Sequence, residues 1–322
     1  MKKVFVDTLL PGDAIDDEFA LAEKTILQKR DGAHYLNIVL ADRSGQIKGV
    51  VWENVQAIAA AANPGDFVRV TGSVSEYRGK RQLVVKTLAA IPADGVNSED
   101  FLPATDMDVD QLFERLVKIT RTFTTPWLNR LFEAFWEDEV FVTAFKKAPA
   151  AKLMHHAYLG GLLVHCLSMA VLADKIAAHY NGLDRDLLIA GAILHDIGKL
   201  REFDYATSID YSDEGRLLSH IAIGLEMLDE KVRQIPDAPR DHVNLLKHML
   251  VSHHGEPAFG ALELPKTIEA VALHFIDDLD SKINAVREFM AKEDPDQTWT
   301  SYHRILGRHF YMGGKRGGIK GA

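Results

Sequence analysis

The feature that most constrains this chain is an apolar segment that ends in a His-Asp pair. Residues 187–194 read Leu-Leu-Ile-Ala-Gly-Ala-Ile-Leu, and His195 and Asp196 follow directly. Asp184 is a good N-cap for a helix that starts there, and a helix that is apolar on nearly every side is buried. Its buried imidazole and carboxylate need compensation. Either a divalent cation or a capping aspartate beside a hydrogen-bonded core histidine supplies it.

Composition limits the class of protein. The chain has 322 residues, 47% hydrophobic residues and a net charge of −9. These values fit two domains with sizeable cores and argue against a protein that coats nucleic acid through charge alone. Residues 1–95 carry 12 basic and 12 acidic side chains, so the excess of carboxylates lies in the remainder, where it is compatible with cation binding or with a solvated acidic surface.

Cysteine content and hydropathy bear on the compartment. The single cysteine, Cys166, excludes an internal disulfide and suits a reducing environment, so we expect a cytoplasmic protein. The longest uncharged stretch, residues 158–173, is shorter than the roughly 20 residues of a membrane span. We expect no signal peptide and no membrane partner.

The first part of the chain has the periodicity of strands. Strands are expected at residues 19–29, 34–40, 46–52, 66–72 and 81–86, and an alanine-rich helix at 55–62. Three strands, a short helix and two strands is the order of a five-stranded OB barrel. We therefore predict an OB-fold nucleic-acid-binding domain over residues 1–95, followed by a linker over 96–110 that is rich in helix-breaking residues.

The remainder has helical spacing of its apolar residues. We predict an all-helical domain over residues 111–312 and a disordered basic tail over 313–322, which makes the chain a multi-domain β + α protein. The expected helices span residues 110–119, 127–146, 155–180, 184–196, 219–233, 241–252, 266–291 and 299–309.

Metal-ligand candidates are concentrated in this helical part. Of the 14 histidines only His34 precedes residue 150. Beyond the His-Asp pair, the candidates are His165, His220, His253 and His254, and the acidic run of Asp277, Asp278 and Asp280. Each histidine is also compatible with a hydrogen-bonded core or capping role. We favour Asp277 over Asp278 because it follows an apolar Phe-Ile pair, where the helix turns inward. A mixture of imidazoles and carboxylates suits Mn²⁺, Fe²⁺, Co²⁺ or Ni²⁺.

The ordered set of these residues resembles the HD superfamily of metal-dependent phosphohydrolases. The family pattern is a histidine, a His-Asp pair and a distant aspartate, and it matches His165, His195, Asp196 and Asp277. The resemblance implies that these four side chains bind one divalent ion, Mn²⁺ above all, with Mg²⁺ as a further candidate. In members with two ions, the second would fall to His220, His253 and His254, with Asp196 bridging; one ion or two stays open.

The resemblance extends over nearly the whole chain. An OB fold followed by an HD domain, with Ser252-His-His-Gly-Glu256 and the run of residues 274–282, is similar to the YhaM-type bacterial 3′→5′ exoribonucleases. This similarity implies trimming of single-stranded RNA, and of single-stranded DNA as a second candidate substrate. Asp196 and Lys199 are the catalytic candidates. Lys199 would bind the scissile phosphate, or is simply a cation at a helix end.

The barrel offers candidates for strand binding. OB folds bind single strands through aromatic platforms and a basic groove. The aromatic candidates are Tyr35, Trp52 and Tyr77, each equally compatible with a core position, and the basic candidates are Arg78, Lys80 and Arg81. We expect these three cations to project into solvent from a hairpin tip and to guide a strand rather than anchor it.

Two other functions remain open from the sequence. The first is an HD phosphohydrolase acting on small or cyclic nucleotides, against which the OB-like domain counts, because a mononucleotide needs no strand-guiding groove. The second is a non-enzymatic single-strand binder, against which the intact ligand set counts. The sequence leaves the oligomeric state and the choice between RNA and DNA undetermined.

Overall fold

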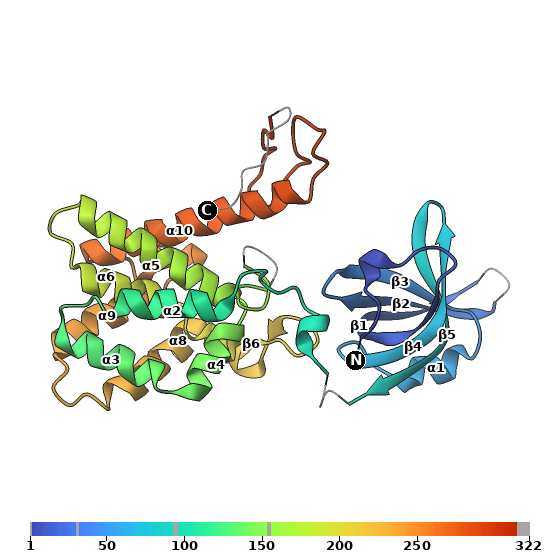
Figure 1. The fold of residues 1–322 in the computed structure, drawn as a ribbon, viewed down its shortest axis with the longest axis horizontal. Helices are drawn as coiled ribbons and strands as arrows, with labels where there is room; N and C mark the ends of the chain where they lie inside the picture. Colours follow the sequence, from blue (N-terminus) through green and yellow to red (C-terminus); the bar gives the residue numbers. More distant parts are fainter. Residues whose placement is uncertain (1, 30–31, 93–95, 153–155, 314–322) are drawn as a thin grey trace.

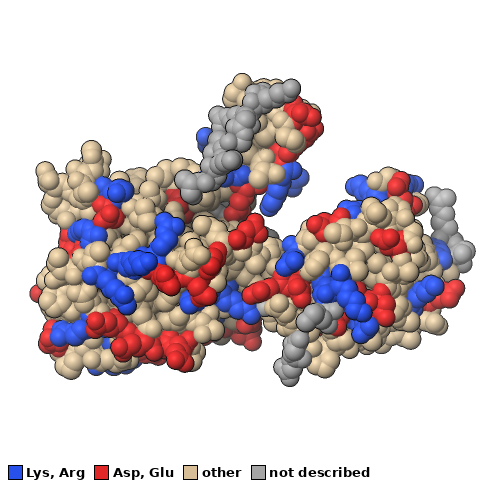
Figure 2. All heavy atoms as spheres, in the orientation of Figure 1, with Lys and Arg blue, Asp and Glu red and all other residues tan. Residues whose placement is uncertain are grey.

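The chain forms two bodies joined by a short extended segment (Figure 1). The computed structural model describes residues 2–29, 32–92, 96–152 and 156–313. Long strands build the N-terminal body and helices build the C-terminal one, so the predicted fold class, an OB barrel followed by a helical domain, is confirmed. Acidic and basic side chains are interspersed over both bodies on the face that Figure 2 shows.

The N-terminal body is a closed five-stranded barrel. Its strands are β1 (Ala14–Gln28), β2 (His34–Asp42), β3 (Gly45–Val51), β4 (Phe67–Tyr77) and β5 (Lys80–Ile91). They close in the order β1-β2-β3-β5-β4, and α1 (Val55–Ala61) lies between β3 and β4 in the chain. Leu36, Ile38 and Leu40 point into the core from β2 while their neighbours are partly exposed. This alternation is the period of two that defined the strand in the sequence.

The segment between the two bodies is fastened to both of them. It contains a short 3-10 helix, η2 (Ser98–Asp100), followed by Phe101, whose ring packs at 4.7 Å from that of Phe67 in the barrel. Further on, the amide of Thr105 donates a hydrogen bond to the carbonyl oxygen of Leu159 in the helical domain. The predicted linker is therefore a packed connection between the bodies.

Two predicted boundaries fall at segments outside the described residues. The end of the OB domain was expected at residue 95, and residues 93–95 are not described. The basic tail was expected at residues 313–322, of which only Gly313 is described. Both boundaries stay predictions.

The C-terminal body is built from helices. They are α2 (Val109–Thr120), α3 (Pro126–Trp136), α4 (Glu139–Lys147), α5 (Gly161–His179), α6 (Arg185–Leu194), α7 (Lys199–Glu202), α8 (Asp213–Val232), α9 (Arg240–Ser252) and α10 (Ile268–Ala291). Its shorter elements are the 3-10 helix η3 (Pro257–Phe259) and a ribbon of β6 (Phe203–Asp204) with β7 (Asp210–Tyr211), whereas the 3-10 helix η1 (Val6–Thr8) belongs to the barrel body.

Helix α6 is the centre of this body. Every residue from Leu187 to Leu194 is buried, and α6 packs against α5, α9 and α10. The prediction of a buried central helix capped by Asp184 is confirmed, since this side chain accepts a hydrogen bond from the amide of Leu187. Helix α5 is long and apolar enough to cross a membrane, but half of that apolar stretch is buried inside the protein.

Two predicted helices have different limits in the structure. The helix expected over 127–146 is two helices, because the side chain of Asp138 accepts a hydrogen bond from the amide of Phe141 and starts α4 anew. The helix expected over 155–180 begins only at residue 161. Gly160, with φ of 80°, lies in the left-handed region and turns the chain into α5.

The helix expected over residues 299–309 is wrong. Residues 298–312 form a β-like turn, which we call the C-terminal hairpin, in which Trp299 pairs with Tyr311 and His303 with Arg308. Gly307, with φ of 65°, lies in the turn. The aromatic and threonine residues of this segment favour extended backbone, and its apolar spacing alone did not reveal that.

Asp186 provides a test of how α6 is held. Its carboxylate accepts hydrogen bonds from the amides and hydroxyls of Thr124 and Thr125. Burial raises its pKa, but these bonds outweigh burial and hold the pKa below its usual value. We expect Asp186→Ala to lower the free energy of unfolding by about 3 kcal/mol, because two partly buried amides and two hydroxyls lose their charged acceptor.

The contribution of Asp186 depends on pH in one direction. The folded state holds the pKa of this carboxyl below the unfolded value, so the stabilisation is present above the unfolded pKa and is lost as the pH falls through the folded one. Chemical denaturation of both proteins, at neutral and at acid pH, measures the difference. Asp237→Ala, which removes an exposed partner of Arg130, should be nearly neutral. Equal stability of Asp186→Ala and wild type at neutral pH would contradict the assignment.

Candidate metal centre

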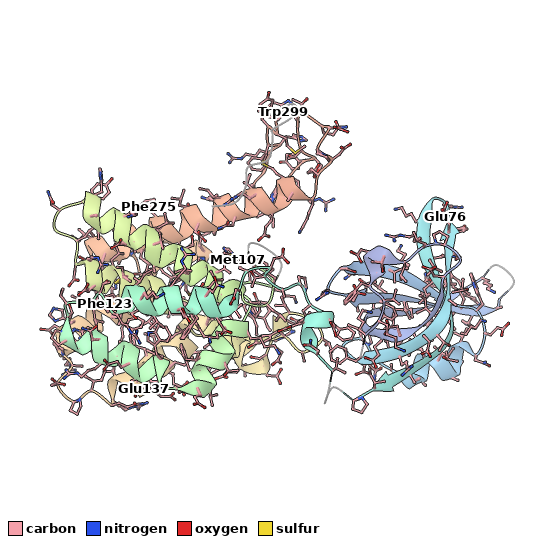
Figure 3. All side chains as sticks on the ribbon, viewed as in Figure 1. Glu76, Met107, Phe123, Glu137, Phe275 and Trp299 are labelled. Atoms are coloured by element: carbon pink, nitrogen blue, oxygen red, sulfur yellow. The ribbon has the colours of Figure 1, made fainter. Side chains whose placement is uncertain are left out.

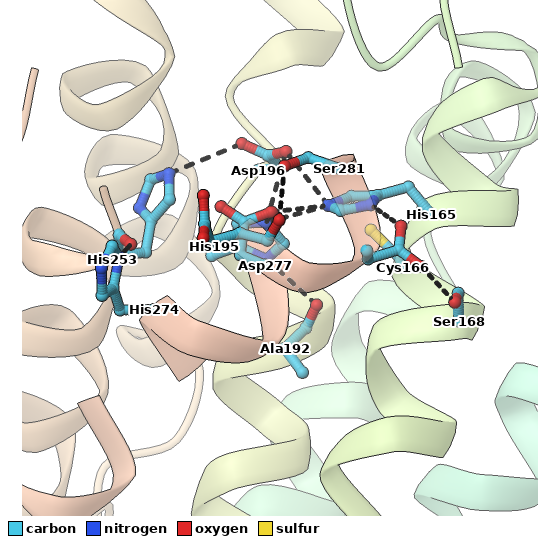
Figure 4. Close-up of polar contacts among 12 residues, drawn as sticks. His165, Cys166, Ser168, Ala192, His195, Asp196, His253, His274, Asp277 and Ser281 are labelled. Carbon is cyan, nitrogen blue, oxygen red and sulfur yellow. Dashed lines mark hydrogen bonds and ion pairs between the residues drawn. The ribbon is translucent and has the colours of Figure 1, made fainter. Parts of the chain in front are cut away.

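The candidate ligands, far apart in the sequence, converge on one place in the helical domain. Figure 4 shows five of them, His165, His195, Asp196, His253 and Asp277. They come from α5 (His165), the end of α6 (His195 and Asp196), α8 (His220), the end of α9 (His253 and His254) and α10 (Asp277). Their ligand atoms fall into overlapping groups in which all atoms lie within 4.8 Å of one another. The structure thus brings together all seven side chains that the sequence singled out.

Four of the imidazoles are held in the same way. The Nδ1 atom of His195 lies 3.1 Å from the carbonyl oxygen of Ala192, and that of His253 lies 2.7 Å from the carbonyl oxygen of Leu250. A carbonyl oxygen only accepts, so Nδ1 carries the proton in both rings. His165 and His220 use carboxylates instead, 2.9 Å from Asp280 and 3.0 Å from Glu202. Each ring thereby offers the lone pair of Nε2 to the interior of the site.

The carboxylate of Asp196 lies between two pairs of these nitrogens. Its Oδ2 atom is 3.3 Å from Nε2 of His195 and 3.7 Å from Nε2 of His165. Its Oδ1 atom is 3.6 Å from Nε2 of His220 and 3.8 Å from Nε2 of His253. One oxygen therefore faces each group, which is the arrangement of a carboxylate that bridges two ions.

Buried polar atoms without a partner mark the same place. Within the described residues, six side-chain nitrogen or oxygen atoms are buried with no hydrogen-bond partner, and four of them belong to Asp196, His220, His253 and His254. Each unsatisfied group costs about 1–3 kcal/mol, so four together are unfavourable unless a ligand binds them. Imidazole nitrogens and a carboxylate oxygen are ligands of divalent transition metals. The residues present fit a metal site.

The two neighbouring aspartates at the start of the acidic run differ in surroundings. Oδ1 of Asp277 lies 3.4 Å from Nε2 of His165 and 3.9 Å from Nε2 of His195. Asp278 instead points away and forms an exposed ion pair with Lys282 at 2.8 Å. The geometry agrees with the preference for Asp277. Its side chain keeps 20% of its surface exposed, so it marks the solvent side of the site.

Sequence reasoning missed a buried network behind His165. Asp280 accepts hydrogen bonds from Nδ1 of His165 and from the hydroxyl of Ser168, and Nε2 of His156 lies 3.4 Å from it. His156 in turn contacts the hydroxyl of Tyr158 at 2.8 Å. The signal was present, since Asp277 and Asp280 are one turn apart on a helix. It gave no indication that Asp280 would orient a ligand from the opposite helix.

Electrostatics differ between the two sides of the site. Burial lowers the pKa of His165, but hydrogen bonds to Asp277 and Asp280 outweigh it and raise the pKa to about 9. Burial favours the neutral form of Asp277, yet its contact with His165 holds its pKa well below the usual range. Burial and the neighbouring His195 lower the pKa of His253. The acids are therefore ionised and His253 is neutral, as metal ligands must be, whereas His165 must lose a proton when it binds a metal ion.

Local backbone features place His220. Ser219, directly before it, has φ of 61° inside α8 and so interrupts the regular helix. Glu202 accepts hydrogen bonds from both the amide and Nδ1 of His220. A Cβ atom on Gly198 would lie 1.9 Å from the carbonyl oxygen of His220. The glycine that follows the His-Asp pair thus allows α8 to approach closely enough to present this imidazole.

Lys199 lies next to the carboxylate of Asp196. Its Nζ atom is 2.6 Å from Oδ2 of Asp196, and its side chain is 14% exposed. It is the first residue of the four-residue helix α7, whose single turn also makes it a cation of the last turn, so the interpretation as a cation at a helix end stays open. A positive charge at this point balances the buried acid.

The barrel residues proposed for strand binding form two groups. Tyr35 and Trp52 stack with ring centroids 5.3 Å apart, and Lys29 lies 4.6 Å above the Trp52 ring. Tyr77 and Arg78 lie at the protruding end of the β4–β5 hairpin, near Glu76 in Figure 3. Trp52 and Tyr77 are exposed, so they are available as platforms.

Arg81 is exposed, as expected of the three cations, but it also has a structural role. Its guanidinium donates hydrogen bonds to the carbonyl oxygens of Val6, Asp7 and Leu9 and so holds η1 against the barrel. Arg78 and Lys80 make no such backbone contacts within the described residues. The loop therefore offers two free cations rather than three.

Comparison with known proteins places the chain in a family. Residues 162–282 match the family described as HD domain, and residues 23–91 match an OB-fold nucleic acid binding domain. The chain is 31% identical over 301 residues to the 3′-5′ exoribonuclease YhaM of Bacillus subtilis, covering 93% of this chain and 95% of that protein. The protein of the same name from Oceanobacillus iheyensis is 31% identical, and the match covers 93% of this chain and 94% of that protein. The one from Halalkalibacterium halodurans is 30% identical, and the match covers 93% of each chain.

The chain belongs to the YhaM family of 3′-5′ exoribonucleases. The match to these YhaM relatives spans both bodies, in agreement with the resemblance that the sequence indicated. All candidate ligands, and Asp280 behind them, lie inside the HD-domain match, whereas the C-terminal hairpin lies beyond its end.

Asp280 allows a test of the orientation of His165. We expect Asp280→Asn to weaken Mn²⁺ binding about 10–100-fold, because an amide holds the Nδ1 proton of His165 less firmly and lowers the basicity of Nε2. Asp278→Asn, on the same helix but pointing to solvent, is the matched control and should bind as wild type does. Competition with a chelator of known affinity measures the difference. Unchanged affinity in a folded Asp280→Asn protein would refute the role of Asp280.

Proposed function

We propose that this protein is a metal-dependent 3′→5′ exoribonuclease that acts on single-stranded RNA. Its membership of the YhaM family supports the reaction and its direction. The observation that carries the proposal is the position of Asp196, whose two oxygens each face a separate pair of Nε2 atoms. Single-stranded DNA presents the same phosphodiester to the site and is the second substrate to be tested. We expect the protein to act in the cytoplasm.

We further propose that the site binds two divalent ions. His165, His195, Asp196 and Asp277 would hold one ion, and Asp196, His220, His253 and His254 would hold the other. Mn²⁺ suits this donor set well, because the set lacks thiolates and mixes imidazole with carboxylate. When bound, such ions neutralise non-bridging phosphate oxygens and activate a water for in-line attack.

The protein's own groups position the substrate and balance charge. Asp196 is buried just beyond the end of α6. Its position would therefore fix the distance between the two groups of metal ligands. Lys199 already carries a positive charge 2.6 Å from Asp196. We propose that its Nζ donates a hydrogen bond to an oxygen of the scissile phosphate that enters beside Asp196. The partly exposed side of Asp277 is the direction from which the strand enters.

The barrel would deliver the strand to this site. Exposed Trp52 and Tyr77 offer flat surfaces for stacking bases, and Lys29, Arg78 and Lys80 lie close to them. Stacking tolerates any base sequence, which suits an enzyme that removes successive nucleotides. The balanced charge of residues 1–95 fits guidance of a moving strand rather than tight anchoring.

Asp196→Ala tests the catalytic assignment. We expect it to reduce hydrolysis to background while strand affinity stays close to wild type, because both ligand groups lose their shared carboxylate but the barrel is unchanged. Time courses on end-labelled single-stranded RNA, with Mn²⁺ and with chelator, measure activity, direction and metal requirement together. Asp278→Ala should retain wild-type activity. Wild-type turnover by Asp196→Ala, or faster turnover of cyclic dinucleotides than of RNA by wild type, would contradict the proposal.

Arg78→Ala combined with Lys80→Ala tests the guiding role of the barrel. Arg81 is left intact because it holds η1. We expect weaker binding of long single strands and a salt dependence that falls by roughly 0.7 in log–log slope for each phosphate that the variant no longer neutralises. Hydrolysis of a dinucleotide should be unaffected. Lys86→Ala, an exposed cation elsewhere on β5, is the control. An equal loss on long and short substrates would show that the loop does not guide the strand.

A further inference from the structure

The C-terminal hairpin presents aromatic rings to solvent. Trp299 is 57% exposed, Tyr302 is 55% exposed and Tyr311 is 55% exposed. Two edge-on contacts, Trp299 with Tyr311 at 5.2 Å and Tyr302 with His309 at 5.3 Å, hold the rings in place across the hairpin. Figure 3 places Trp299 in the lobe that rises from the end of α10. Large rings with this exposure are available for contact with another molecule.

The hairpin has a small internal framework that keeps these rings outside. Thr300 and Met312 are buried, and the amide of Thr300 donates a hydrogen bond to the carbonyl oxygen of Phe310. The ring of His303 packs edge-on against Phe289 of α10 at 4.5 Å and ties the hairpin to the helix. The exposed rings are therefore not needed for the hairpin's own core.

The charge of the hairpin is opposite to that of the chain. The chain carries −9 overall, but residues 297–313 contain no acidic side chain and include Arg304 and Arg308. Both arginines are exposed, and Arg304 forms no hydrogen bond or ion pair with any described residue. Acidic residues lie only at the base of the hairpin, where Glu293 accepts hydrogen bonds from Ser301. Arg308 donates one hydrogen bond, from Nε to the carbonyl oxygen of Leu306. Exposed rings and exposed guanidinium groups on one short element are complementary to bases and phosphates.

The hairpin is also connected to the candidate metal centre. It follows α10, the helix that carries Asp277, and at 1.5 Å per residue the end of α10 lies about 20 Å from that ligand. Figure 1 shows the hairpin rising from this end, on the same side of the helical domain as the barrel. A strand that contacts the barrel and the metal centre has the hairpin within reach.

We propose that the C-terminal hairpin binds single-stranded RNA, with Trp299, Tyr302 and Tyr311 stacking on bases and Arg304 and Arg308 contacting phosphates. This inference rests on the proposed function and adds a second strand-binding surface to the barrel. A second copy of the chain is the competing occupant. The charge of the hairpin favours nucleic acid, because two exposed arginines without an acidic neighbour in residues 297–313 are complementary to phosphates.

The apolar groove between α5 and α10 differs from the hairpin in having no positive charge among its lining residues. It is lined by Leu172, Ile176, Tyr180, Val271, Phe275 and Leu279. This lining contains no arginine or lysine. Tyr180, which is 58% exposed, therefore provides a matched control for a hairpin tyrosine: it has the same ring and the same exposure in surroundings without positive charge.

The test is strand affinity of the full-length protein in chelator, where hydrolysis is stopped. The probe is a fluorescein-labelled oligoadenylate of about 20 nucleotides, longer than the site of one OB fold, read by anisotropy. We expect Trp299→Ala and Tyr302→Ala each to weaken affinity about tenfold, as loss of one stacking ring does. Tyr302→Phe and Tyr180→Ala should bind as wild type does. Arg304→Gln should lower the salt slope by roughly 0.7, and it removes no contact within the described fold.

The outcomes separate this inference from the proposed function. If wild type trims RNA with Mn²⁺ and the hairpin variants keep wild-type affinity and salt slope, the hairpin inference is overturned and the function stands. If wild type neither binds nor trims RNA, the function itself fails. Sedimentation velocity on the same proteins tests whether the hairpin joins two copies of the chain. If Tyr302→Ala or Arg304→Gln dissociates an oligomer and leaves strand affinity unchanged, the hairpin is a contact between copies and the inference is overturned.

Discussion

The structure depends on hydrogen bonds that fix four imidazoles through Nδ1. Carbonyl oxygens at two helix ends hold His195 and His253, and the carboxylates of Asp280 and Glu202 hold His165 and His220. Each bond places a proton on Nδ1, so the four Nε2 atoms face Asp196, and that of His165 becomes a ligand once its ring is neutral. Without these bonds the rings would rotate, and the site would be only a collection of buried polar groups.

The surrounding fold brings these anchored rings together. Helix α6 is buried along its whole length, so its end delivers His195 and Asp196 to the centre of the domain. Burying a carboxylate there is unfavourable in isolation, and Lys199 supplies the balancing charge at 2.6 Å. The absence of a side chain at Gly198 lets α8 approach and present His220. Packing of α6, the charge of Lys199 and the close approach of α8 at Gly198 therefore all position the ligand atoms around Asp196.

The sequence predicted much of this arrangement and failed for identifiable reasons. Alternation of apolar residues predicts the five barrel strands, and the apolar run before His195 predicts the buried helix. Both patterns can be read from neighbouring residues in the sequence. Asp280 was named as a neighbour of Asp277, but its role depends on His165 in another helix, a long-range contact that no local pattern reveals. The local sequence of residues 299–309 predicts a helix, whereas cross-strand pairs such as Trp299 with Tyr311 decide the shape of the C-terminal hairpin. Arg81 is exposed, as the sequence predicts, but only the fold shows that it also binds the backbone of η1.

The central claim is that Asp196 bridges two cations held by imidazoles from separate helices. The most direct measurement is a crystal structure of the protein grown with Mn²⁺, with anomalous difference density collected near the manganese edge. The account predicts two peaks on either side of Asp196, one beside His165, His195 and Asp277 and the other beside His220, His253 and His254. Density that shows no ion in contact with Asp196 at saturating Mn²⁺ would contradict it.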